Sequence, residues 1–409
     1  MKLWMKYVIG IAIGLVAALI LPVNSPHGQE VLDFILNIVI RFGRFILLPL
    51  LFFSVATACY KLKEEKRIFK IGAWTVAVIV VTSVILVVLG MLSALIVKLP
   101  PIPISVEKVS DIPTLDIKSL ITRIFPYSGF QALLEGAYLL PCFIIAGLMG
   151  AGASSEKMYG KAGINLFVSL SHICYNVMSF FAEILSVGMI AIMCKWSLEF
   201  FALQKAKVFM PLIILLTVDL LIVALVIYPL LTGLICHEKK PYKILYASIC
   251  PFLVGFFSGD TNLTLPLLMK HGKESLGIKR RANAAVFPLF SIFGRGGAAL
   301  VQAICFVQIF RSYSLLNIDG KVALWIGGMS FLLSFVLADH SSGGPFFAIT
   351  IMCIAYGPSF EAGYLLLKGV APIICAFAAG FDVITAMYGS YIVVNKSDYI
   401  QPVETKKFI

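Results

Sequence analysis

Long apolar stretches, each about the length of a membrane-spanning helix, recur along nearly the whole 409-residue sequence. A spanning helix needs about 20 mainly apolar residues, because the hydrocarbon core of a bilayer is about 30 Å thick. The uninterrupted stretches fall at 7–21, 31–60, 71–97, 131–153, 164–193, 208–236, 284–310 and 364–395. Since no tract between them is long enough for a soluble domain, we expect an all-α polytopic membrane protein with eight transmembrane helices.

The charged residues agree with a protein embedded in the lipid bilayer. Only 13% of the residues are charged, and the net charge of +12 comes from Lys and Arg at the ends of the apolar stretches. They form neither a basic helix nor a pattern interleaved with aromatic residues, which argues against nucleic acid as a partner. With the amino end inside, more Lys and Arg fall on the cytoplasmic side than on the external side. This bias predicts a multi-pass protein of the cell inner membrane with both termini cytoplasmic.

Sequence patterns of other protein classes are missing. Residues 1–22 have the basic flank and apolar run of a signal peptide, but no small-residue cleavage site follows, so we interpret them as a retained first helix. The nine Cys are scattered singly without metal-ligand spacing. Neither a Ser-His-Asp spacing, an HExxH motif nor a nucleotide-binding loop appears. We therefore expect no enzyme activity, no cofactor and no bound metal centre.

Two further apolar segments are interrupted near their middle by polar residues. The segment 243–268 is broken at 258–262, and the segment 322–356 is broken at 339–345. Backbone that is not helical survives at membrane depth only where it is buried in protein or lines a wet cavity. Paired interruptions of this kind indicate a transporter's binding site, formed by two re-entrant helical hairpins whose tips converge. The alternative is two ordinary spans with surface loops.

Five short motifs follow one another along the chain: RFGRFILLPL at 41–50, FPYS at 125–128, SGDTNLTLP at 258–266, GRGGAALVQAIC at 294–305 and SSGGP at 341–345. In their order and spacing they resemble the dicarboxylate/amino acid:cation symporter family, which has the glutamate-transporter fold. The resemblance implies a scaffold that forms a homotrimer and a transport domain that moves against it. It implies scaffold spans one and two in 1–69, transport span three in 70–98, scaffold spans four and five in 99–205, the rest of the transport domain in 206–396 and a cytoplasmic tail in 397–409.

Arg295 is the most informative single residue. An Arg near the bilayer centre costs at least about 2.5–3.5 kcal/mol unless it finds partners. The flanking Gly294, Gly296 and Gly297 predict an unwound segment. Two interpretations stand: the guanidinium binds a substrate carboxylate, for which its planar fork is suited, or it forms an internal salt bridge with Asp260 or Asp382.

The same stretch departs from the family where the family binds sodium. The family's NMDGT supplies oxygen ligands there, whereas this chain has Gly294–Ala298 with one permanent cation. A guanidinium repels a second cation. Thr82 and Ser83 match a threonine/serine pair of one family sodium site. We therefore expect sodium dependence to be weak or absent, with coupling to sodium or protons left open.

The remaining candidates lie at the two tips and in the last span. Asp260, Thr261 and Asn262 form the first tip. Asp260 could pair with Arg295, carry a proton or bind a substrate ammonium group; the alternative is a solvated loop carboxylate. His340, Ser341 and Ser342 form the second tip, and His340 is a candidate for proton coupling or a structural group. Asp382 and Thr385 are the substrate-binding candidates of the last span.

These features favour secondary active transport of a small organic anion, either an amino acid or a dicarboxylate, by alternating access. A non-transporting membrane sensor or assembly protein on the same fold is the alternative, because the family's coupling ligands are lost. An anion channel is a further alternative, since a fixed Arg can select anions.

Overall fold

The computed structural model describes residues 2–20, 25–103, 122–134, 138–155, 157–314, 318–340, 342–357, 360–401 and 403–409. Within this described part the fold is all-helical, with 83% helix and no strands. The elements are α1 (Leu3–Ile20), α2 (Pro26–Arg44), α3 (Leu47–Glu64), α4 (Ile68–Ile96), η1 (Gln131–Leu133), α6 (Leu140–Ala153), α7 (Lys157–Ala206), α8 (Met210–Ile222), η2 (Val223–Ile227), α9 (Tyr228–Cys236), α10 (Tyr242–Ser258), α11 (Thr261–Glu274), α12 (Arg280–Phe293), α13 (Gly296–Tyr313), α14 (Gly320–Val336), η3 (Leu337–Asp339), α15 (Gly344–Tyr356), η4 (Gly363–Val370), α16 (Ala371–Lys396) and η5 (Thr405–Lys407).

Seven helical segments of the described residues are long and apolar enough to cross a membrane, and they coincide with seven of the eight predicted spans. They cover 3–20, 27–64, 68–96, 160–203, 210–236, 280–313 and 363–396. The stretch 131–153, predicted as a full span, differs, because its helix α6 has only 14 residues, or about 21 Å at about 1.5 Å per residue. This helix begins directly before Pro141, which a helix tolerates in its first turn but not in its interior.

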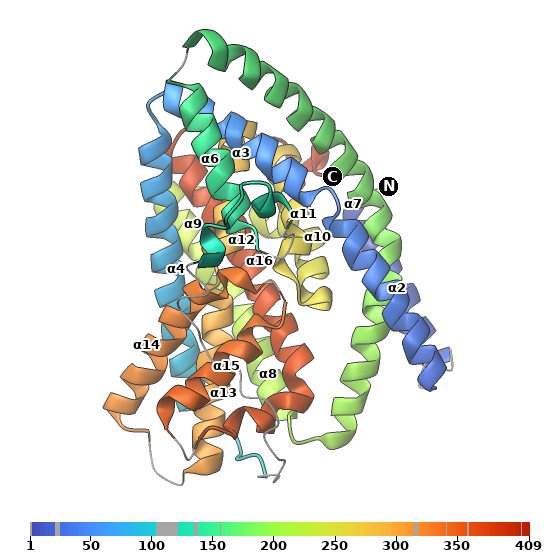
Figure 1. Ribbon diagram of the computed structural model, residues 1–409. Helices are drawn as coiled ribbons and strands as arrows, with labels where there is room; N and C mark the ends of the chain where they lie inside the picture. Colours follow the sequence, from blue (N-terminus) through green and yellow to red (C-terminus); the bar gives the residue numbers. More distant parts are fainter. Residues whose placement is uncertain are drawn as a thin grey trace.

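The helices pack in two groups that meet along α3 and α12. In one group, α7 lies against α1, α2 and α3, and α6 packs on α3. Figure 1 shows α7 as a long curved helix along one side of the molecule, with α2 beside it. In the other group, α13 lies between α4 and α16, and α10 packs on α16. The main hydrophobic core extends through both groups, and the most completely enclosed helices, α13 and α16, belong to the second.

Both interrupted segments form two helices joined by a short irregular turn, as the polar interruptions predict. Hairpin one consists of α10 and α11, which meet at Gly259 with a positive φ of 63° and pack against each other. Hairpin two consists of α14, η3 and α15, and its turn contains Gly343 with a φ of 72°. Glycine adopts this left-handed conformation without steric cost.

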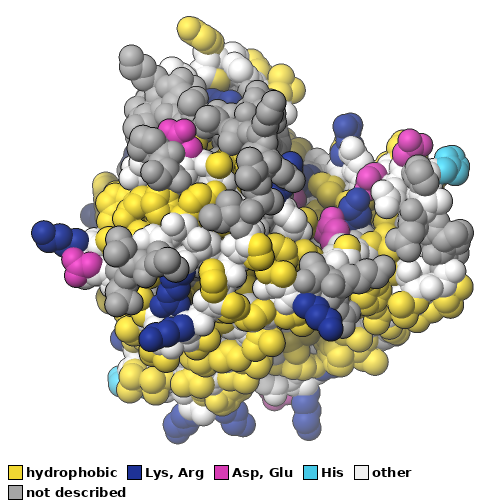
Figure 2. Space-filling model, turned by 90° about the horizontal axis from the view of Figure 1, so that it is seen from below, with side chains coloured by type: hydrophobic (Ala, Val, Ile, Leu, Met, Phe, Trp, Pro, Cys, Tyr) yellow, Lys and Arg dark blue, Asp and Glu magenta, His cyan; other side chains and the backbone are white. Residues whose placement is uncertain are grey.

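The surface of the described residues is largely apolar, as a bilayer requires. Phe69, Ile96 and Leu324 are each at least 76% exposed. Figure 2 shows hydrophobic side chains over much of one face, with Lys and Arg side chains scattered among them and along the lower edge. The two chain ends lie close together, because Lys2 donates to the Tyr246 hydroxyl and the Tyr246 ring stacks on Phe408.

The contact between α1 and α7 depends on two glycines four residues apart. A Cβ atom at Gly10 would lie 2.3 Å from the Ser186 carbonyl oxygen, and one at Gly14 would lie 2.5 Å from the Ile190 carbonyl oxygen. Small residues at this spacing let two helix backbones approach closely in a membrane.

We predict that Gly14→Leu lowers the thermal unfolding midpoint of the purified protein, by an amount corresponding to about 1–3 kcal/mol of overpacking. Gly72→Leu on α4 is the matched control, since nothing lies within 4 Å of its Cβ position. Equal midpoints for the two variants would show that α1 does not pack on α7 in this way.

Candidate substrate site

The break between α12 and α13 brings Arg295 into the centre of the helical core. The helix stops at Phe293 and restarts at Gly296, which confirms the predicted unwound segment. A Cβ at Gly296 would lie 2.9 Å from Ser83 Cα, and one at Gly297 would lie 2.2 Å from Phe381 Cβ. The two glycines are therefore required for α13 to approach α4 on one side and α16 on the other.

Arg295 forms an internal ion pair with Asp382 of α16. The Nη1 atom of Arg295 lies 3.8 Å from Asp382 Oδ2, and each side chain is only 5% exposed. The other carboxylate oxygen, Oδ1, accepts a hydrogen bond of 3.1 Å from the backbone N–H of Ala298. Of the two interpretations of Arg295, the internal salt bridge is the one that this conformation contains, and its partner is Asp382 rather than Asp260.

A small void lies beside the Asp382 carboxylate. Its volume is about 10 Å³, and its polar lining comes from Thr261, Thr264, Ser291 and Asp382, so it has about the room that one water molecule needs. The Ser291 hydroxyl is buried without a hydrogen-bond partner among the described residues. A single water here would satisfy both this hydroxyl and the carboxylate.

Asp260 caps the second helix of hairpin one. Its Oδ1 atom accepts hydrogen bonds of 2.9 Å from the N–H of Asn262 and 3.3 Å from the N–H of Leu263. This is the usual N-cap arrangement, in which a carboxylate satisfies unpaired N–H groups of the first turn. The positive end of the α11 dipole therefore already carries an anion from the chain itself.

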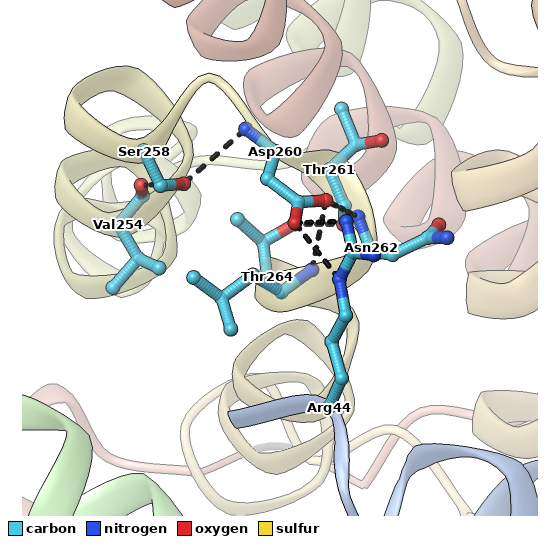
Figure 3. Close-up of polar contacts among 8 residues, drawn as sticks. Arg44, Val254, Ser258, Asp260, Thr261, Asn262 and Thr264 are labelled. Carbon is cyan, nitrogen blue, oxygen red and sulfur yellow. Dashed lines mark hydrogen bonds and ion pairs between the residues drawn. The ribbon is translucent and has the colours of Figure 1, made fainter. Parts of the chain in front are cut away.

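The same carboxylate is bound by Arg44 at the end of α2. Arg44 Nε donates to Asp260 Oδ2 over 2.9 Å, and Arg44 Nη2 contacts the same oxygen. Figure 3 shows the Arg44 side chain reaching the turn between α10 and α11. Asp260 is 2% exposed and Arg44 23% exposed. Arg44 thus connects α2 to hairpin one, because the buried carboxylate needs a cation.

Both hairpin tips line one cavity of about 350 Å³, which we call the tip cavity. Hairpin one contributes Ser258 and Gly259, and hairpin two contributes Ser342 and Gly343. The opposite wall comes from α2 and α7, including Lys195 and Glu199. The tips converge on this cavity, as the two polar interruptions predicted, and the cavity lies between the two groups of helices.

The other predicted site residues lie elsewhere. Thr385 bonds with the Tyr228 hydroxyl over 2.7 Å, so it faces α9. The Thr82 hydroxyl donates to the carbonyl of Val78 in its own helix, and Ser83 is buried against Gly296. The ring of His340 stacks on Phe347 with 4.3 Å between centroids. Ser341 lies outside the described residues.

Lys195 and Glu199 were not among the predicted site residues. They lie four residues apart on α7, and Lys195 pairs with Asp33 of α2 over 2.8 Å. The signal for them was available, because ionisable side chains within a membrane segment most often face a cavity or a partner. The predicted span ended at residue 193, whereas the apolar helical segment continues to Leu203, so both side chains were left outside the membrane.

A comparison with known protein families matches the sodium:dicarboxylate symporter family over residues 3–396. The chain belongs to the sodium:dicarboxylate symporter family. The resemblance drawn from the motifs is thereby confirmed, and the chain is a multi-pass membrane protein of a family of transporters rather than enzymes.

Individual relatives within this symporter family match over short segments only. A segment of 85 residues is 31% identical to the neutral amino acid transporter B(0) of Homo sapiens, covering 21% of this chain and 16% of that protein. The B(0) transporter of Bos taurus is 32% identical over 72 residues, covering 18% of this chain and 13% of that protein. The neutral amino acid transporter A of Homo sapiens is 29% identical over 72 residues, covering 18% of this chain and 14% of that protein. The matches thus span no more than 16% of the length of these relatives.

We predict that Arg44→Gln destabilises the protein by about 3 kcal/mol, because it leaves a buried carboxylate without its cation. Adding Asp260→Asn to the same variant should restore most of this loss, since Asn removes the charge and keeps the N-cap. Thermal unfolding of the two single variants and the double variant measures the coupling. Additive effects of the two substitutions would contradict the ion pair.

Proposed function

We propose that this chain is a secondary active transporter of a small amino acid or dicarboxylate and that it works by alternating access. The observation that carries the proposal is the tip cavity, a space of about 350 Å³ in which two broken hairpins meet a wall of α2 and α7. Broken helices that present their tips to one cavity are typical of the substrate sites of secondary transporters.

The charges around the tip cavity favour an amino acid. The N-cap residue of α15, Gly343, supplies no side-chain hydrogen bond, whereas Asp260 places a carboxylate at the amino end of α11. A substrate carboxylate is stabilised at such a helix end. Glu199 on the opposite wall supplies an anion for a substrate ammonium, whereas Lys195 is already paired with Asp33.

The packing supports the division into a scaffold and a transport domain. We propose that the scaffold comprises 1–69 and 99–205 and that the transport domain comprises 70–98 and 206–396, with 397–409 as a tail. Both hairpins are re-entrant in this arrangement, because α11 and α15 have 14 and 13 residues and span only about 20 Å each at about 1.5 Å per residue. A homotrimer in the cell inner membrane, with both termini cytoplasmic, completes the proposal.

Arg295 replaces a coupling cation in this proposal. Its guanidinium neutralises Asp382 from 3.8 Å away inside the core, where a free sodium ion would meet strong repulsion from it. The transport cycle then carries its own cation along with the substrate, so a sodium gradient adds no driving force. Proton coupling or substrate exchange supplies the drive.

We predict that proteoliposomes containing the protein take up amino acids equally well in sodium chloride and in choline chloride. Arg295→Met should abolish uptake, since Asp382 is left uncompensated, and should also create a cation site at this carboxylate. Sodium should therefore raise the thermal unfolding midpoint of Arg295→Met more than that of the unmodified protein, by mass action.

The double variant Arg295→Met/Asp382→Asn is the control for that cation site, because it removes the carboxylate as well. Sodium should leave its midpoint unchanged. Steep sodium dependence of uptake by the unmodified protein, together with normal uptake by Arg295→Met, would refute a fixed internal cation.

We predict that Glu199→Gln lowers amino acid uptake by about tenfold or more, the change expected when a charge-assisted contact is lost. Glu183→Gln is the matched control on the same helix, since Glu183 is 54% exposed and pairs with Lys6. Uptake competition with dicarboxylates distinguishes the two substrate classes. Unchanged amino acid uptake by Glu199→Gln would show that Glu199 does not bind the ammonium group of the substrate.

A further inference from the structure

A second, separate pocket lies where α3 and α7 meet the beginning of α12. Its volume is about 460 Å³, and it shares no lining residue with the tip cavity. We call it the basic pocket, because Lys61, Lys279, Arg280, Arg281 and His172 line it, and no Asp or Glu among the described residues does. Such a concentration of positive charge attracts anions.

Glu64 attracts Lys61 electrostatically but forms no ion pair with it among the described residues. Two other carboxylates near the pocket already have partners. Glu65 forms an ion pair with Arg281 and accepts a hydrogen bond from the Tyr399 hydroxyl. Glu274 accepts from the Tyr175 hydroxyl over 2.7 Å. Neither Lys61 nor Arg280 forms an ion pair with any described residue. The pocket thus retains positive charge that the described residues do not neutralise.

Arg280 is held in place for a ligand. Its Nη2 atom donates to Ser171 Oγ over 2.7 Å, and Ser171 Oγ lies 2.9 Å from Ser54 Oγ. Its guanidinium carbon lies 5.6 Å from the centre of the Tyr175 ring. The Nη1 atom is buried and has no hydrogen-bond partner among the described residues, and the same holds for Thr57 Oγ1. A fixed guanidinium and an unsatisfied hydroxyl therefore line one cavity.

The beginning of α12 adds to the attraction. Lys279 is its N-cap residue and supplies no side-chain hydrogen bond to the first turn. Arg280 and Arg281, at the start of this helix, line the pocket, so the positive end of the helix dipole favours an anion there.

We propose that the basic pocket binds a phosphate group. Several convergent cations, hydroxyl donors and a helix amino end match the three acceptor oxygens and the double charge of a phosphate better than a single carboxylate. The phosphate comes either from a soluble anion or from the headgroup of an anionic lipid. Since the pocket joins α3 and α7 to α12, a bound phosphate holds the two groups of helices in the present arrangement.

The test uses the full chain in nanodiscs of phosphatidylcholine. In one arm, inorganic phosphate is added against potassium chloride of equal ionic strength; in the other, phosphatidic acid is included in the bilayer. The thermal unfolding midpoint is measured in both. A shift with inorganic phosphate identifies a soluble anion as the ligand, and a shift with phosphatidic acid alone identifies a lipid headgroup.

Arg280→Gln and Lys61→Met should each weaken the apparent affinity by about tenfold, as expected for loss of one charge-assisted contact. Arg280→Lys keeps the positive charge but loses the two parallel N–H donors of the guanidinium, so it should lose less affinity than Arg280→Gln. Lys70→Gln is the control, because Lys70 is exposed and lies outside the pocket. Absence of any shift in both arms, or a full shift in Arg280→Gln, would overturn the proposal. This experiment measures phosphate binding and does not depend on amino acid uptake. Failure of the phosphate proposal can therefore be told apart from failure of the transport proposal.

Discussion

A guanidinium cannot remain unpaired in an apolar interior, and the core of this protein is arranged around that requirement. Arg295 meets Asp382 because α12 ends at Phe293 and α13 begins at Gly296. Gly296 and Gly297 have no side chain, which lets the start of α13 pack closely against α4 and α16. The break in the helix, the close approach of α4, α13 and α16, and the charge balance of the core are therefore one feature. Removing either charge would leave the other buried without compensation.

The second buried ion pair connects the two groups of helices. Arg44 belongs to α2, while Asp260 belongs to hairpin one. Because Asp260 also caps α11, this tip has its anion supplied from within the chain. The N-cap residue of α15, Gly343, supplies no such carboxylate. The asymmetry between the two tips thus follows from one carboxylate, and it gives the tip cavity a defined polarity.

The fold class and the helix breaks could be predicted because they depend on local sequence. Apolar length predicts spanning helices, and polar residues with glycine at 258–262 and 294–297 predict interruptions. The prediction failed at 131–153, where hydropathy alone cannot register the effect of Pro141 on where a helix starts. Arg295 was recognised as a site residue for the same local reason, since a charge inside an apolar run is conspicuous.

The partners of these charges were decided by tertiary structure alone. The sequence by itself determined that Arg295, Asp260 and Asp382 are costly to bury, because that cost belongs to each side chain. It did not determine that Asp382 rather than Asp260 pairs with Arg295, nor that Arg44 reaches Asp260 across 216 positions of the chain. Nor did it bring Glu199 to the hairpin tips. Which charges meet depends on how helices distant in sequence pack, and that packing is a property of the whole chain.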